Sequence, residues 1–407
     1  MDKTMNAAPS GVRTHIGFFG RMNAGKSSLI NALTGQQVSI VAPEAGTTTD
    51  VVRKPMEIHG IGPCVLLDTA GFDDAGNVGA KRVAASLAAA ETADIAVILL
   101  GDTEDWAMER QWAERFARAK VPTLLVLGHS DARTGAENAA LSERARQALG
   151  KTPYLLSTKT QEGLDAFRAA LIDAVPHEPP RQILGDLVSP GDVILLVMPQ
   201  DPQAPEGRLI LPQVQTIREA LDRHCLTLCV QTQELPAALR ALRQPPALIV
   251  TDSQAFEAVY PLRPEGTRLT SFSVLFAALK GDVDYAVQSV RAIERLNESS
   301  RVLIAECCTH APMNEDIGRI KIPRMLRARI GQGLRVDIAA GADFPEDVGT
   351  YDLIIQCGAC MFNRNYVMSR TRRAQAAGIP MTNYGITMAY LQGILDRVDT
   401  GRKENHE

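Results

Sequence analysis

The stretch Gly20-Arg-Met-Asn-Ala-Gly25-Lys26-Ser27 decides the fold of the first part of this 407-residue chain. It has the spacing of a P-loop, follows an apolar run at 15–19 and precedes a helical pattern at 27–33. Glycines in such a loop let backbone N–H groups wrap a phosphate, and the helix N-terminus adds a favourable dipole. The sequence therefore predicts a strand, a phosphate-binding loop and a helix in that order.

The residues of this loop have separable expected roles. Lys26 is predicted to contact the β- and γ-phosphates of a nucleotide and Ser27 to place its hydroxyl on Mg²⁺. Gly20 and Gly25 supply the backbone, and we assign Ser28 to the same nucleotide site.

Outward from the loop, short apolar runs alternate with helical patterns, which is typical of βαβ units with a mostly parallel sheet. The proline-rich segment 176–180 reads as a linker. We therefore expect an α/β protein with three α/β domains, at 11–177, 183–264 and 265–400. The predicted strands lie at 15–19, 65–67, 95–100, 123–127, 154–156, 193–197, 227–230, 247–250, 302–305, 335–339 and 353–355; the later predicted helices lie at 214–223, 236–243, 273–279 and 285–296.

Composition narrows the class of partner. Lys plus Arg number 43 against 47 Asp plus Glu, and this net charge of −4 lacks the basic field on which nucleic-acid binding relies, so no nucleic acid is expected. The apolar runs at 95–100 and 193–198 fall far short of the ~20 residues of a membrane span, so no membrane is expected either. Residues 1–10 show no secretory signal, which predicts a cytoplasmic protein.

Two further segments complete the predicted nucleotide site. In Val65-Leu-Leu-Asp68-Thr69-Ala70-Gly71, Asp68 is fit to hold Mg²⁺ and the Gly71 amide to bind the γ-phosphate. The run Gly46-Thr47-Thr48-Thr49-Asp50 alone could be an ordinary polar loop. In this company it predicts a switch, in which Thr47 and Thr48 join the nucleotide site and Thr48 contacts Mg²⁺.

On these motifs, residues 14–175 resemble the GTPases of the translation-factor-related class that includes Era and the tRNA-modification GTPase. The resemblance implies a P-loop GTPase fold and GTP as the nucleotide. It assigns the guanine base to Asp131 and to Ser157-Thr158-Lys159. In Gly128-His129-Ser130-Asp131 only the aspartate of the family's Asn-Lys-x-Asp box is kept.

The resemblance also bears on the rate of hydrolysis. Phe72 stands where Ras-like enzymes carry the glutamine that orients water, which predicts slow hydrolysis. Asn23 occupies the position that helps hold K⁺ in the potassium-activated members of the class. We therefore name Lys26 and Asn23 as the catalytic residues, with a hydrogen bond from Asn23 to its own loop as the alternative role.

Cysteines follow two predicted strands of the third block. Glu306-Cys307-Cys308-Thr309-His310 comes after 302–305, and Gln356-Cys357-Gly358-Ala359-Cys360 comes after 353–355. If these strands are parallel neighbours, three or four thiols converge at one sheet edge. A lone Cys-x-x-Cys could equally be a redox pair or half of a zinc site, so both alternatives stay open.

This arrangement, joined to a GTPase domain, resembles the [FeFe]-hydrogenase maturation GTPases. The resemblance implies a scaffold that carries the diiron precursor of the hydrogenase active site, with Cys308, Cys357 and Cys360 as ligands of a [4Fe–4S] cluster. It further implies a dimerising middle block in a homodimer or higher oligomer. The implied partners are two radical SAM maturation enzymes and the apo-[FeFe]-hydrogenase.

The chain departs from that family at one site position. Many members have His before Cys-x-x-Cys, whereas this chain has Gln356. His310 is a candidate neighbour of the cluster, with a hydrogen-bonding role the expected one. Cys307 is expected to turn away from Cys308 and to be buried or spare. The other cysteines, Cys64, Cys225 and Cys229, are expected in the core.

A basic run between the cysteine groups allows two interpretations. It is either a solvated helix face or an electropositive rim for an anionic precursor or an acidic client. Its members are Arg319, Lys321, Arg324, Arg327, Arg329 and Arg335.

A competing function for the whole chain is a ribosome- or RNA-associated GTPase with a C-terminal zinc site, and the excess of acidic over basic residues disfavours it. A redox protein that uses Cys357 and Cys360 leaves Cys308 without a role.

Overall fold

The computed structural model describes residues 11, 13–34, 51–72, 76–101, 103, 105–175, 181–199, 209–307, 316–341 and 343–401, with the backbone alone at 76–80. Contacts divide the chain into two compact units, Met1–Glu178 and Pro179–Glu407. Each unit is described by itself.

The first unit is built on a six-stranded sheet in the order β2-β3-β1-β4-β5-β6. All neighbouring strands are parallel except β2 and β3, which are antiparallel. The strands are β1 Thr14–Gly20, β2 Val52–Ile58, β3 Gly62–Asp68, β4 Ile95–Leu100, β5 Thr123–Leu127 and β6 Tyr154–Leu155; the helices are α1 Lys26–Thr34, α2 Gly76–Thr92, α3 Ala107–Arg118, α4 Gly135–Leu149 and α5 Leu164–Asp173. The expected α/β sheet is confirmed.

Strand β2 was not predicted from the sequence, for a physical reason. It is an edge strand with mostly exposed or half-buried residues, so it lacks the apolar run that marked the other strands. It also contains Pro55, which a sheet tolerates at an edge.

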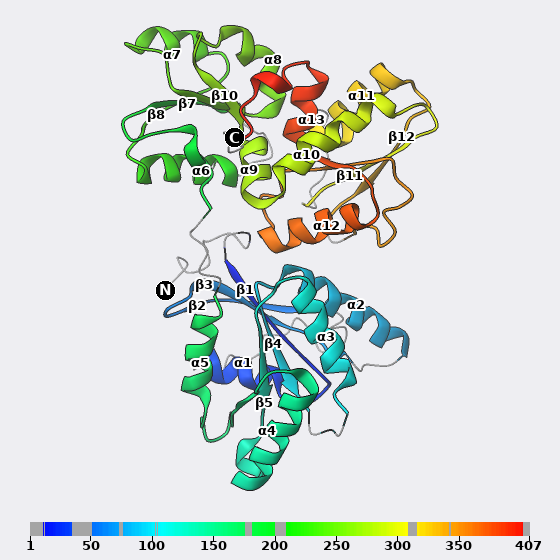
Figure 1. Cartoon of the computed structure of the whole chain (residues 1–407). Coiled ribbons are helices and arrows are strands. Elements are labelled where there is room, and N and C mark those ends of the chain that lie inside the picture. Colours follow the sequence, from blue (N-terminus) through cyan, green and yellow to red (C-terminus); the bar gives the residue numbers. More distant parts are fainter. Residues whose placement is uncertain are drawn as a thin grey trace, which may run out of the picture. The chain divides into compact units, whose positions relative to one another are not determined.

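Side chains of this sheet alternate between two cores. Phe18 packs with Leu29 and Phe167 on the face covered by α1 and α5, whereas Phe19 packs with Trp112 and Phe116 on the opposite face. Figure 1 shows α1 and α5 on one side of the sheet and α2 and α3 on the other. Both faces are therefore covered, as a parallel sheet requires.

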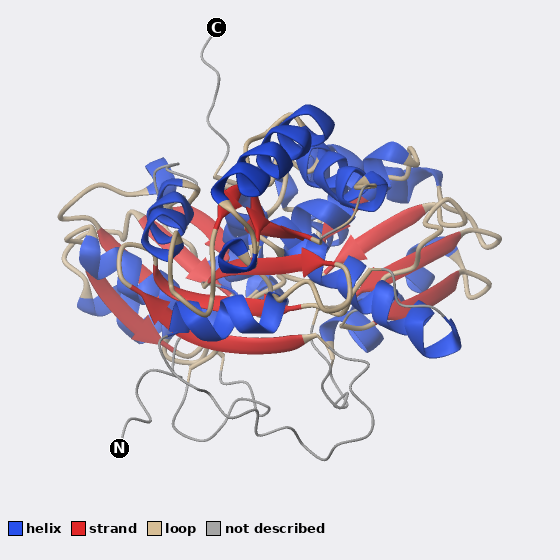
Figure 2. Cartoon of the chain, turned by 90° about the horizontal axis from the view of Figure 1, so that it is seen from below, coloured by secondary structure: helices blue, strands red, loops and turns tan. Residues whose placement is uncertain are grey.

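The second unit contains two four-stranded sheets, in the orders β10-β9-β7-β8 and β12-β11-β13-β14, each with parallel neighbours. Helices alternate with most of these strands along the chain, and Figure 2 shows the helices and strands of the whole molecule. The strands are β7 Val193–Val197, β8 Leu226–Val230, β9 Leu248–Thr251, β10 Arg268–Ser271, β11 Arg301–Ala305, β12 Arg335–Ala339, β13 Leu353–Gln356 and β14 Met381–Asn383. The helices are α6 Leu211–Asp222, α7 Leu235–Ala241, α8 Phe256–Val259, α9 Phe272–Lys280, α10 Val283–Ser289, α11 Ile322–Ile330, α12 Arg364–Ala376 and α13 Tyr384–Leu391, with a π-helical turn at Ile317–Lys321 before α11.

One hydrophobic core joins the two sheets. It includes Leu195 and Ile249 of the first sheet together with Ile304 and Ile355 of the second. Strand β10 pairs with β9, so the first sheet extends past residue 264, the expected domain end. Strands β10 and β14 and helices α12 and α13 were absent from the prediction. Among the described residues, every helix is too short or too polar to cross a membrane.

Candidate functional site

The phosphate-binding loop joins β1 to α1, as the sequence predicts. Gly20 and Gly25 have φ values of 154° and 92°, and a Cβ at Gly20 would meet the carbonyl oxygen of Leu99 at 2.7 Å. Both positions therefore need glycine. Asn23, also left-handed at φ 62°, is exposed, and its side chain makes no hydrogen bond to another described residue.

Lys26 is tied to its own loop. Its side chain is buried, and Nζ donates hydrogen bonds to the carbonyl oxygens of Gly20 at 3.0 Å and Arg21 at 2.7 Å. The ammonium group is thereby held at the loop, where a phosphate would be wrapped.

The residues predicted to hold Mg²⁺ lie together where they are described. Ser27 Oγ donates a 2.6 Å hydrogen bond to Oδ2 of Asp68, the last residue of β3. The pairing of Phe18 with Asp68 in the parallel β1 and β3 brings this carboxylate beside the loop. A hydroxyl and a carboxylate are oxygen ligands of the kind that Mg²⁺ prefers.

The segment after Asp68 is fixed on the sheet. The hydroxyl of Thr69 donates to the carbonyl of Phe18 at 2.6 Å, and Ser86 of α2 donates to the carbonyl of Ala70 at 3.2 Å. Gly71 follows them. Phe72 is buried and stacks on Trp112 with ring centroids 5.3 Å apart, so it cannot orient a water molecule. The threonines Thr47 and Thr48 lie outside the described residues.

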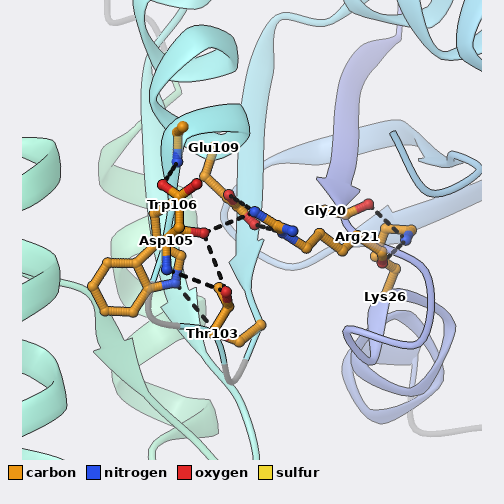
Figure 3. Close-up of polar contacts among 9 residues, drawn as sticks. Gly20, Arg21, Lys26, Thr103, Asp105, Trp106 and Glu109 are labelled. Carbon is orange, nitrogen blue, oxygen red and sulfur yellow. Dashed lines mark hydrogen bonds and ion pairs between the residues drawn. The ribbon is translucent and has the colours of Figure 1, made fainter. Parts of the chain in front are cut away.

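A residue that sequence reasoning missed anchors the loop to α3. Arg21 Nε donates to Oε1 of Glu109 at 2.8 Å, and its Nη2 donates to the carbonyl of Asp105 at 2.8 Å. Figure 3 shows the Arg21 side chain extending from the loop toward Glu109, while Lys26 points back to Gly20. Glu109 has 0% side-chain exposure, so this buried carboxylate has a guanidinium partner from the phosphate-binding loop.

The residues predicted to bind the guanine base meet at the ends of β5 and β6. A hydrogen bond from Ser157 holds the pKa of Asp131 below its usual value, so this carboxylate stays ionised. Ser157 is buried, and its Oγ accepts from the backbone N–H of Lys159 at 3.2 Å. Thr158 lies between them in the same loop. His129 has φ 55°, and a Cβ at Gly25 would lie 3.7 Å from its Nε2, so the ring reaches the phosphate-binding loop.

In the second unit, β11 and β13 are parallel neighbours, as predicted, with Ala305 paired to Gln356. Cys307 and Cys357 therefore leave the sheet at the same edge. The backbone N–H of Cys307 donates to Sγ of Cys357 at 3.1 Å. Hydrogen bonds from the side chain and backbone of Cys307 lower the pKa of the Cys357 thiol.

Cys307 is buried, as expected, and its sulfur also accepts a hydrogen bond. Its Sγ accepts a 3.4 Å hydrogen bond from Nη1 of Arg370, a side chain that is 1% exposed and stacks over the rings of Phe344 and Tyr366. Cys308 and His310, the other members of this group, lie outside the described residues. Within the part of the chain that the structure describes, no three His, Cys, Asp or Glu side chains form a metal-binding group.

Cys360 ends a tight turn after β13. Ala359, just before it, has φ 50°, and Lys280 of α9 donates to three carbonyl oxygens of the segment. Gln356, in the position of the family histidine, is buried, and its Oε1 has no hydrogen-bond partner among the described residues. The thiols of Cys64 and Cys225 are buried, but the expectation for Cys229 is wrong: it is exposed on the edge strand β8.

The basic run fits the interpretation as a solvated helix face for its members on α11. Arg319 forms a 2.7 Å ion pair with Glu306, whose side chain is 4% exposed, beside Cys307. Lys321 bonds to Gln254, and Arg327 to the carbonyl of Leu334. Helix α11 buries Ile322, Pro323 and Leu326 and exposes Arg324 and Arg329; Arg335, on β12, is exposed too. The helix members thus form a solvated face, and Arg319 is neutralised by a carboxylate.

Family models match successive parts of the chain. Residues 183–281 match the hydrogen maturase F dimerization domain, and residues 284–399 match the hydrogen maturase F tetramerization domain. Residues 15–129 match the 50S ribosome-binding GTPase.

Individual proteins resemble the first unit. The tRNA modification GTPase MnmE of Paracidovorax citrulli is 38% identical over 169 residues, which are 38% of this chain and 34% of that protein. The MnmE of Chromobacterium violaceum is 34% identical over 164 residues, which are 40% of this chain and 35% of that protein. The matched region thus spans about a third of the length of these curated relatives.

Solved structures also resemble parts of the chain. A variant of Aquifex aeolicus Era bound to GDP.AlF4- is 19% identical with a TM-score of 0.34, over 56% of this chain and 97% of that one. The FeoB G-domain of Methanococcus jannaschii is 24% identical with a TM-score of 0.30, over 40% of this chain and 98% of that one.

Proposed function

Because the chain belongs to the hydrogen maturase F family, we propose that it is a GTP-hydrolysing scaffold that carries the diiron precursor of the [FeFe]-hydrogenase active site. The observation that carries this proposal is the parallel pairing of β11 with β13, which puts two cysteine groups at one sheet edge in a chain that also contains a GTPase domain. The precursor is cargo, and its expected recipient is the apo-[FeFe]-hydrogenase. Its expected source is the two radical SAM enzymes.

GTP and Mg²⁺ are the proposed ligands of the first unit. The Ser27–Asp68 contact, the Lys26 loop and the ionised Asp131 support binding of a magnesium-bound guanine nucleotide. Slow hydrolysis is supported by the burial of Phe72. Stimulation by K⁺ is supported by the exposed, left-handed Asn23, whose amide oxygen is available for a cation.

The donor set of the second unit fits a thiolate-bound cluster. Cys357 has a lowered pKa, as a thiolate ligand requires, and Cys360 is three residues further along the same turn. We propose that Cys357 and Cys360, together with Cys308, hold a [4Fe–4S] cluster, with His310 close by. Such a cluster, bound by three cysteines, supplies one iron open to exchangeable ligands. Because thiolate ligands must stay reduced, we propose a cytoplasmic location.

The second unit supports a homo-oligomer. Family models for a dimerization domain and a tetramerization domain cover it. Strand β8 is an edge of its sheet, and Leu226 on it is 63% exposed. An edge with exposed apolar residues is a template for pairing with a second copy. We propose that β8 contributes to the dimer contact.

Nucleotide state is proposed to act on partner exchange rather than on cluster chemistry. Every residue assigned to GTP lies in the first unit and every residue assigned to the cluster in the second. Coupling would then appear as a change of about 1–3 kcal/mol in affinity for a protein partner, which is typical of allosteric linkage. Measured affinities for the precursor-making enzymes with GTP and with GDP would test it, and equal affinities would contradict it.

The deciding experiment is anaerobic reconstitution of the full chain with iron and sulfide, followed by metal analysis and an absorption spectrum. Brown, iron-rich protein that loses its colour in Cys357→Ser supports the proposal. The matched control is Cys229→Ser, an exposed cysteine of the same unit, which should keep full iron. A colourless protein that binds zinc would instead support the ribosome- or RNA-associated alternative, to which the description of the 15–129 match also points.

A further inference from the structure

A buried lysine lies directly behind the Cys-x-x-Cys turn. Lys280 is the last residue of α9 and is 5% exposed. Its Nζ donates to the carbonyl oxygens of Ala359 and Cys360, both at 3.1 Å, and of Phe362 at 2.8 Å. An ammonium group has three N–H donors, and these carbonyls are enough to satisfy all of them.

The position of this lysine in the sequence is unusual for its helix. Helix α9 reads Phe-Ser-Val-Leu-Phe-Ala-Ala-Leu-Lys, and most of its residues are buried. The ammonium lies 5.4 Å from the ring centroid of Phe276, one turn earlier. Burying a charge is costly unless it is well partnered, so a lysine at this place points to a specific task.

The helix end that carries Lys280 is itself fixed. The N–H of Gly281 donates to the carbonyl of Ala277 at 2.9 Å, and Arg364 of α12 donates to the carbonyl of Gly281 at 3.0 Å. On the same helix, Ser273 donates to Asn383 at 3.1 Å. These hydrogen bonds fix the backbone from which the Lys280 side chain extends.

The turn that Lys280 contacts needs such support. Ala359, between the two cysteines, has φ 50°, a left-handed conformation that is unfavourable for a residue with a Cβ. The hydrogen bonds from Lys280 to residues on both sides of Cys360 stabilise this conformation. They also lie across a domain boundary, because Lys280 falls in the dimerization-domain match and the turn in the tetramerization-domain match.

We propose that Lys280 is a positioning residue of the cysteine site, which sets the geometry of the Cys357–Cys360 pair and places a buried positive charge behind it. This inference rests on the proposed iron–sulfur function. Reduction potentials of such clusters depend on net charge, hydrogen bonding and solvent exposure. A nearby cation stabilises the more negative, reduced state, so Lys280 raises the midpoint potential of the bound cluster.

The test compares Lys280→Gln, which removes the charge, with Lys280→Arg, which keeps it. Lys321→Met is the control, because it removes the same charge from the same unit at a lysine that bonds to Gln254. After anaerobic reconstitution, the measurements are iron and sulfide content, the electron paramagnetic resonance spectrum, and the midpoint potential from a redox titration. Circular dichroism reports folding of each variant.

We expect Lys280→Gln to have a more negative midpoint potential than the wild type and to lose iron to a chelator faster. Lys280→Arg should lie between them, and Lys321→Met should match the wild type. An unchanged potential and unchanged iron loss in Lys280→Gln would overturn the inference. If Lys280→Gln does not fold, Lys280→Met, which also removes the charge, takes its place, and an unchanged potential with unchanged iron loss in that variant would overturn the inference.

The role of Lys280 in holding the turn can also be measured in protein that carries no cluster. In the apoprotein, hydrogen exchange of the amides at 357–362 should be faster in Lys280→Gln than in Lys321→Met. Equal exchange would refute the positioning role. Failure of the wild type to take up iron would count against the proposed function, whereas this exchange measurement would still decide the role of Lys280 in holding the turn.

Discussion

Oε1 of Glu109 lies 2.8 Å from Nε of Arg21, and this ion pair links the first turn of α3 to the loop that is built to bind phosphate. The carbonyl of the same Arg21 accepts a hydrogen bond from Lys26 at 2.7 Å. The orientation of the P-loop lysine therefore depends on an acid that is distant in sequence.

This relationship predicts that Glu109→Gln weakens nucleotide binding as well as stability. The amide keeps the shape of the side chain but loses the charge that holds Arg21. Leaving a buried polar partner poorly satisfied costs about 1–3 kcal/mol. Denaturant unfolding and titration with a fluorescent GDP analogue would measure the two effects. Glu114→Gln, an exposed acid on the same helix, should change neither, and normal affinity in Glu109→Gln would disprove the link.

Potassium dependence should reside in Asn23. Hydrolysis of GTP by the wild type is expected to be faster in K⁺ than in Na⁺, because a cation beside Asn23 would offset transition-state charge. Asn23→Ala should hydrolyse GTP at the same rate in both salts, and Lys26→Ala should abolish hydrolysis in either. Phosphate release assays at matched ionic strength would show this. Equal rates of GTP hydrolysis by the wild type in the two salts would contradict the proposed potassium site.

Base specificity should depend on Asp131. Because Ser157 lowers its pKa, Asp131 stays ionised as the pH falls from neutral through its usual value, and its contribution to GTP binding is lost only at a lower pH. Ser157→Ala should move that loss of affinity to a higher pH. Asp131→Asn should lose about 1.5–3 kcal/mol of GTP binding, the range for a hydrogen bond to a charged group. Titrations with GTP and XTP test this, and unchanged GTP affinity would remove Asp131 from the site.

Iron retention should separate the cysteines of the second unit. Cys308→Ala, Cys357→Ala and Cys360→Ala should each lose the cluster, because a three-thiolate site has no spare ligand. Cys307→Ala should keep its iron, since the contact from Cys307 to Cys357 includes a backbone N–H that the substitution leaves in place. Iron per protein after reconstitution is the measurement. Loss of iron from Cys307→Ala would make its thiol a ligand.

Dimerisation should depend on the β8 edge. Leu226→Glu places a charge on the exposed apolar edge, which is how natural sheets prevent edge pairing. The variant should be smaller than the wild type in light scattering at micromolar concentration. Leu262→Glu, an exposed apolar residue in the turn after α8, is the control that should leave the oligomer intact. An unchanged mass in Leu226→Glu would move the interface elsewhere.

Much of the fold could be predicted because its central strands are apolar throughout and lie between recognisable helices. Strands β1, β4 and β5 matched their apolar runs, and the expected neighbourhood of β11 and β13 was confirmed. Edge strands were harder, because β2 is polar along most of its length. Cys229 was misplaced for a different reason, because its apolar strand β8 looked buried in the sequence but lies at a sheet edge with one side open.

The contacts that shape the sites were less accessible from sequence. Arg21 and Glu109 are far apart along the chain, and no local pattern pairs them. Arg370 carried no signal, since arginine in an amphipathic helix usually faces water. Lys280 carried a weak one: a single charge that ends an apolar helix could have been questioned as a possible buried cation.

The hydrophobic core shared by the two sheets of the second unit has a consequence for how that unit can be divided. Val302 and Ile304 pack in the same cluster as Leu195 and Ile249, so a cut at 281–284 would expose apolar surface on both fragments. We therefore expect residues 179–407 to melt in a single cooperative transition, even though separate family models cover their two halves. Fragments that end between these halves would aggregate, so neither half is a module that could be grafted onto another protein by itself.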